Sequence, residues 1–110
     1  MTFLYLNSSK MGNGDDTLGE ILIESFLEKL SNSDAKIDFI GCVNSGVKLT
    51  TQGSPVIDIL RKFKERGAKI ASCGTCLDYH KIRDELLIGD IGTMEQSVEL
   101  MAKADKIFNP

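Results

Sequence analysis

The sequence is poor in several features that mark large classes of proteins. Its 110 residues contain two prolines and no tryptophan, and 42% of them are hydrophobic, so it lacks the composition of a disordered or proline-rich segment. It has no cluster of lysine and arginine, and its net charge is -3, which argues against a nucleic-acid or anionic membrane surface. We therefore expect small molecules or other proteins as partners.

Long hydrophobic runs are also absent. The apolar run Thr2 to Leu6 has no basic segment before it and is too short for a membrane span or the core of a signal peptide. We therefore expect the chain to remain in the cytoplasm. Its length fits one domain with one buried core, spanning residues 1–110.

Apolar patterning predicts alternating strands and helices. Short apolar runs bounded by turn residues predict strands at residues 2–6, 36–43, 69–72 and 106–108. Apolar residues spaced three and four apart predict helices at about 16–30, 54–67 and 75–86, and a last one opening at Thr93. The segment 44–53 is polar and contains glycine, which predicts a loop.

The same spacing predicts which side of a helix faces the core. Capping boxes at Thr17–Glu20 and Thr93–Gln96 would open the first and last helices. The expected inward residues of these two helices are Leu18, Ile21, Leu22, Phe26 and Leu30, and then Met94, Val98 and Met101.

Strands that alternate with amphipathic helices predict an α/β fold with a parallel sheet covered on both faces. The loops that leave the carboxyl ends of such strands meet at one edge, where ligands usually bind. Three segments should share that edge, and they are residues 7–16, 44–54 and 73–76. Their polar residues should therefore lie near Cys73 and Cys76.

Two of the three cysteines form a CxxC pair, Cys73 and Cys76, where the third strand gives way to a helix. In the cytoplasm thiols stay reduced, so such a pair indicates catalytic, redox or metal chemistry before a structural disulfide. The free amides of a helix N-terminus stabilise a thiolate, which is the attacking form. The alternative is that one or both thiols are small buried apolar side chains.

A metal site is less favoured by the sequence. A structural zinc site needs four ligands, and these would have to be both thiols of the pair together with Cys42 and His80. We expect no metal and no cofactor. His80 is interpreted as a surface or partly buried side chain, with a proton shuttle beside the thiols as the alternative.

Three stretches together suggest a family, and they are GNGDDTLGEIL, VNSGVKLTTQGSPVIDIL and SCGTCLDYHKIRDELLIGDIGTM. They resemble the DsrE/DsrF-like domain that forms the C-terminal half of YedF-type proteins linked to selenium metabolism. The resemblance implies a three-layer αβα fold around a central, mostly parallel sheet. It also implies homo-oligomers, as trimers or hexamers, and a cysteine that receives sulfur as a persulfide, whose place Cys73 holds.

We therefore expect a sulfurtransferase-like relay protein. Cys73 would take sulfane sulfur, and Cys76 would release it or protect the site as a disulfide. Protein donors and acceptors of sulfur are the expected partners, a TusA-like protein among the candidates. The alternatives are a thiol–disulfide redox protein and a non-catalytic oligomeric binding module. The polar residues expected to orient the partner's sulfur are Asn7, Asn13, Asn44, Ser45 and Thr75.

Overall fold

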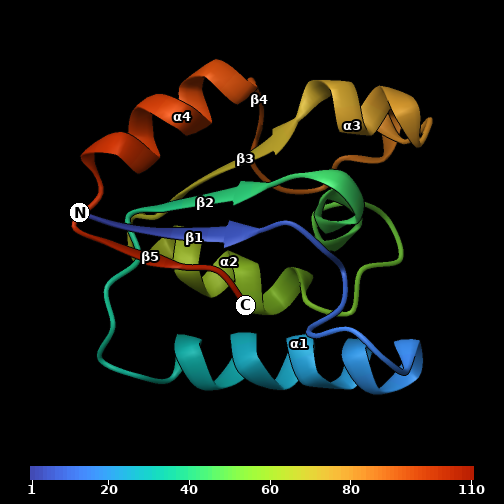
Figure 1. Ribbon diagram of the computed structural model, residues 1–110, viewed down its shortest axis with the longest axis horizontal. Helices are drawn as coiled ribbons and strands as arrows, with labels where there is room; N and C mark the ends of the chain where they lie inside the picture. Colours follow the sequence, from blue (N-terminus) through green and yellow to red (C-terminus); the bar gives the residue numbers. More distant parts are fainter.

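A five-stranded sheet forms the centre of the molecule (Figure 1). The computed structural model describes all 110 residues. All neighbouring strands are parallel, in the order β4-β3-β2-β1-β5, so the predicted mostly parallel sheet is confirmed and is parallel throughout. The strands are β1 (Thr2–Leu6), β2 (Phe39–Cys42), β3 (Lys69–Cys73), β4 (Asp90–Gly92) and β5 (Lys106–Phe108).

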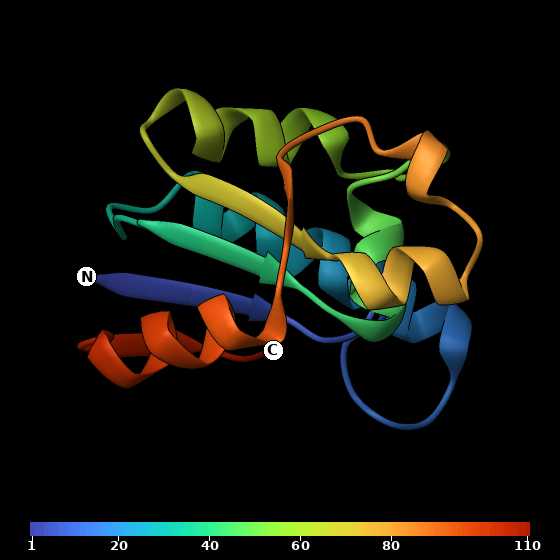
Figure 2. The same ribbon diagram turned by 90° about the horizontal axis from the view of Figure 1, so that it is seen from above.

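Helices flank the sheet on both faces, as predicted. Figure 1 shows α1 (Asp16–Ser31) and α2 (Ile57–Glu65) on one side and α4 (Met94–Lys103) on the other. The short helix α3 (Gly74–Tyr79) continues from the end of β3, which Figure 2 shows from above. None of these helices combines the length and the hydrophobicity needed to cross a membrane.

The main core lies between the sheet and the pair α1 and α2. Each fully buried aliphatic or aromatic side chain stabilises the fold by about 1.5–3 kcal/mol relative to its exposed state. The opposite face is covered less completely, because no residue of α4 is buried. The core side chains include Leu4, Leu6, Ile23, Leu27, Ile40, Leu60, Phe63 and Ile70.

Helix α1 faces the core with a side that overlaps the predicted one only in part, since Leu30 is buried and Phe26 is partly buried as predicted. Its buried stripe is Gly19, Ile23, Leu27 and Leu30, whereas the predicted Leu18, Ile21 and Leu22 are exposed. The incoming loop fixes this orientation, since the Met11 N–H donates to the Gly19 carbonyl at 3.0 Å. Gly19 packs closely against Lys10 and Met11, and because glycine has no side chain, hydrophobicity could not indicate that this side faces inward. The helix is capped by Asp15, two residues before Thr17, the predicted cap.

Helix α4 shows the same kind of difference. The capping box of Thr93 and Gln96 is confirmed. Met94 and Val98, however, are 52% and 57% exposed, so the prediction that they face the core is wrong. The partly buried stripe runs along Ser97, Leu100, Met101 and Ala104, so of the three predicted residues only Met101 lies on the inward side. Ser97 and Ala104 lie on this inward side. Because neither is strongly hydrophobic, the apolar spacing selected Met94 and Val98 instead.

Local backbone conformation accounts for three further corrections. The predicted loop after β2 is a 3₁₀ helix, η1 (Asn44–Leu49), because Val47 and Leu49 are buried. The helix predicted to reach residue 86 ends at Tyr79, since Lys81 adopts a left-handed φ of 60°. A second short 3₁₀ helix, η2 (Arg83–Glu85), follows. Strand β2 begins at Phe39, three residues after the predicted start.

Candidate functional site

Cys73 lies at the carboxyl edge of the sheet. It is the last residue of β3, which pairs with β2 on one side and β4 on the other. Its backbone is extended, and it directly precedes α3. Asn44 follows β2 and Asn7 follows β1, so both lie at the same edge of this parallel sheet. The predicted arrangement of the three loops at this edge is confirmed.

Cys76 is one turn further on, and a backbone amide contacts its sulfur. The Asn44 N–H donates to Cys76 Sγ at 3.1 Å, and Asn44 has a left-handed φ of 52° that aims this amide. Burial raises the pKa of the Cys76 thiol, and the hydrogen bond and charge of neighbouring Cys73 raise it further. The amide of Asn44 acts in the opposite direction.

The two thiols line different hollows. Cys73 lines a hollow of about 320 Å³ between α4 and the sheet, whose walls include Phe3, Phe39 and Ala71. Cys76 lines an open hollow with Asn44, Thr75 and His80. Both hollows have apolar and polar residues in their walls, and the hollow of Cys76 also contains Val43 and Met94.

The structure brings only part of the predicted polar rim to the thiols. Asn44 and Thr75 line the hollow of Cys76. The Ser45 hydroxyl accepts a hydrogen bond from the Ser9 N–H at 3.0 Å, so it joins two loops. Asn7 and Asn13 are exposed and line neither hollow of the thiols. Whether any of these side chains orients a partner stays a prediction.

Sequence reasoning missed two side chains of this hollow. Tyr79 is 82% exposed and lies three residues after Cys76, on the neighbouring turn of α3. That spacing was available as a signal, because residues three apart on a helix share a side. Met94 reaches the hollow from the start of α4, after β4. Strand β4 was not predicted, so no sequence signal placed Met94 there.

Cys42 lies on the other face of the sheet from Cys73. It pairs in register with Ser72, and successive strand residues point to opposite faces. Burial raises the pKa of Cys42 to about 12, although a hydrogen bond with Ser72 acts to lower it. The four-ligand zinc site that the sequence left as a less favoured alternative would require Cys42 beside the pair. No three histidine, cysteine, aspartate or glutamate side chains gather as metal ligands in the structure.

Cys42 leads to a prediction for alkaline pH. Its pKa rises from 9.0 to about 12 on folding, so between these values the unfolded chain binds fewer protons than the folded one. The free energy of unfolding should then fall as pH rises, by up to about 1.4 kcal/mol per pH unit. Cys42→Ala should show a shallower decline between about pH 9 and 10.5, measured by urea unfolding. Equal slopes for the two proteins would contradict the buried, protonated thiol.

Fold and site together define an α/β protein with an all-parallel sheet and a pair of partly exposed thiols at its carboxyl edge. The chain belongs to the DsrE/DsrF-like family, whose sequence pattern matches residues 39–110. Comparison with curated proteins finds no match.

Two solved structures share the fold. The ychN protein from E. coli is 19% identical to this chain, with a TM-score of 0.61 and coverage of 97% of both chains. The protein of unknown function MTH1491 from Methanobacterium thermoautotrophicum is 12% identical, with a TM-score of 0.62. That match covers 98% of this chain and 97% of the other. At such identities the likeness shows the fold alone.

Proposed function

We propose that the chain is a sulfur-relay protein that carries a persulfide on Cys73. The observation that carries the proposal is a pair of free, partly exposed thiols at the carboxyl end of an interior parallel strand. An amide N–H directed at the second sulfur supports it, because such donors stabilise developing negative charge. The DsrE/DsrF-like family also supports it, since its active members hold sulfur on a cysteine at this place.

The relay would work by thiolate exchange. The Cys73 thiolate attacks the outer sulfur of a donor persulfide, the donor's sulfur–sulfur bond breaks, and the donor leaves as a thiolate. No external oxidant is needed, because the sulfane sulfur moves from one thiol to another. Cys76 then attacks the persulfidated Cys73 and expels hydrosulfide, which leaves a disulfide between the two cysteines. Protonated Cys76, with its raised pKa, would delay this second step.

The mass of the intact protein after incubation with a low-molecular-weight persulfide tests the proposal. We expect the gain of one sulfur atom, removed again by a thiol reductant. Loss of two hydrogens in the wild type together with no sulfur adduct in Cys76→Ser, which cannot form the disulfide, would favour a thiol–disulfide redox protein instead. An unchanged mass would favour a non-catalytic binding module.

We further propose that the partners are a protein sulfur donor and acceptor and further copies of this chain, in the cytoplasm. Large apolar side chains around α4 support self-association, because Ile91, Met94 and Val98 are all exposed. Light scattering is expected to give the mass of a trimer or hexamer, and Val98→Lys should reduce it. A monomer at high concentration would contradict this part of the proposal.

A further inference from the structure

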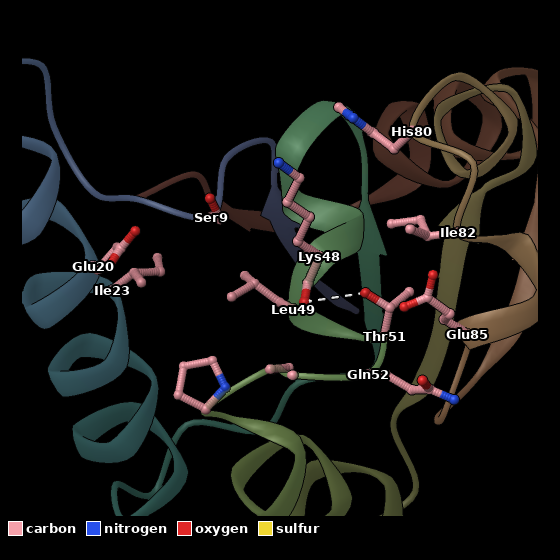
Figure 3. Close-up of a pocket in the computed structure, with 13 residues that line it drawn as sticks. Ser9, Glu20, Ile23, Lys48, Leu49, Thr51, Gln52, His80, Ile82 and Glu85 are labelled. Carbon is pink, nitrogen blue, oxygen red and sulfur yellow. Dashed lines mark hydrogen bonds between the residues drawn. The ribbon is translucent and has the colours of Figure 1, made fainter.

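A third hollow, a cleft larger than the one at Cys73, opens at the same edge of the sheet. It has a volume of about 570 Å³, within the range of roughly 300–1,000 Å³ typical of small-molecule sites. His80 lines this cleft and also the hollow of Cys76, so the two are neighbours. Figure 3 shows the cleft between α1, η1 and the segment after α3. The polar residues that line it include Ser9, Glu20, Lys48, Gln52, His80 and Glu85.

Three charged side chains of this cleft have no charged partner. Glu20, Lys48 and Glu85 take part in none of the ion pairs of the structure. In Figure 3, Lys48 stands between the wall that carries Glu20 and the wall that carries Glu85. The cleft therefore offers one positive and two negative groups to a ligand.

The wall around Glu85 is held in place by the backbone. The Gln52 N–H donates to the Glu85 carbonyl at 2.9 Å, and the Leu87 N–H donates to the Thr50 carbonyl at 2.9 Å. An antiparallel bridge between Thr51 and Leu86 joins the same segments. Because these backbone bonds within the chain fix the wall, binding would cost little ordering of the backbone.

We infer that this cleft binds a small zwitterion, a free amino acid with its carboxylate on Lys48 and its ammonium on Glu85. A purely apolar ligand would leave the charged wall without partners. A ligand with negative charge alone would meet two carboxylates. The inference rests on the proposed function in one respect: in the relay, this ligand is an amino-acid thiol or persulfide whose sulfur points past His80 toward Cys76.

Three thioethers test the inference without any transferable sulfur. S-methyl-L-cysteine carries both charges, 3-(methylthio)propionate lacks the ammonium, and 2-(methylthio)ethylamine lacks the carboxylate. Titrations of ¹⁵N-labelled protein followed by NMR should show the zwitterion binding about three- to fivefold more tightly than either analogue. The largest shifts should fall on the amides of Gln52, His80 and Glu85.

Charge-neutral variants assign each end of the ligand. Lys48→Met should bind the zwitterion and the amine equally, because the carboxylate then has no partner. Glu85→Gln should bind the zwitterion and the carboxylate analogue equally. Lys62→Met on α2 and Glu28→Gln on α1, both exposed and outside the cleft, should retain the wild-type preference.

Equal affinity for the three probes, or the same loss in Lys62→Met as in Lys48→Met, would overturn the inference. The outcome is separable from that of the relay, because the probes have no thiol. A protein that binds S-methyl-L-cysteine as expected but gains no sulfur from a persulfide would refute the relay and retain the zwitterion site. A protein that gains sulfur but does not distinguish the probes would refute the zwitterion site and retain the relay.

Discussion

Gly46→Ala is expected to destabilise the protein by more than about 3 kcal/mol, beyond the usual cost of an extra methyl group in a packed interior. A Cβ at this position would lie 2.0 Å from the Leu6 carbonyl oxygen. That oxygen already accepts the Val43 N–H at 3.0 Å, so it cannot retreat without opening the junction of β1 and β2. The contact involves backbone on both sides, and no side-chain rotation can relieve it.

Urea unfolding measures this effect directly. Lys48→Ala is the matched control, because it lies in the same 3₁₀ helix and its side chain is exposed. Its free energy of unfolding should stay within about 0.5 kcal/mol of wild type. If Gly46→Ala fails to fold, its absence from the soluble fraction beside a normal Lys48→Ala gives the same answer. A wild-type midpoint for Gly46→Ala would contradict the close approach.

Cys73→Ser is expected to abolish persulfide uptake. A hydroxyl cannot accept sulfane sulfur under conditions in which a thiolate does, and Cys73 is the proposed acceptor. Cys76→Ser should still take up sulfur, because only the release step needs a second thiol. It should also be unable to form the internal disulfide. The expected effects of the two substitutions therefore differ in kind as well as in size.

Intact mass and peptide mapping after a timed incubation with a persulfide donor distinguish the two variants. Cys42→Ala is the matched control, because its thiol is buried on the opposite face of the sheet, and it should load sulfur as wild type does. Sulfur found on Cys76 in Cys73→Ser at the normal rate would reverse the assignment of the two roles. Normal loading in both variants would place the acceptor outside the pair.

The order of strands and helices could be predicted because short apolar runs and helical spacing are strong local signals. Strand β4 escaped prediction, since three residues, one of them glycine, carry too little pattern. The side that α1 and α4 turn to the core was mispredicted for another reason. Their inward sides include Gly19, which packs closely against Lys10 and Met11, and Ser97, and neither residue carries a hydrophobic signal.

The candidate site was predictable to the level of its loops. Topology brings the ends of parallel strands to one edge, which correctly gathered Cys73, Cys76 and Asn44. The side-chain arrangement was not predictable, because it depends on backbone geometry that the sequence does not display. Asn44 reaches Cys76 through its amide, not its side chain, and Ser45 joins two loops instead of facing the thiols.

The outermost strands of the sheet, β4 and β5, are each three residues long. The edge strand of a sheet has unpaired backbone N–H and C=O groups with which a strand of another chain can pair. A shorter edge strand allows fewer such hydrogen bonds. The longer strands β1, β2 and β3 have neighbours on both sides. The fold is thus a poor template for adding a foreign strand, which protects it from the edge-to-edge joining that leads to fibres.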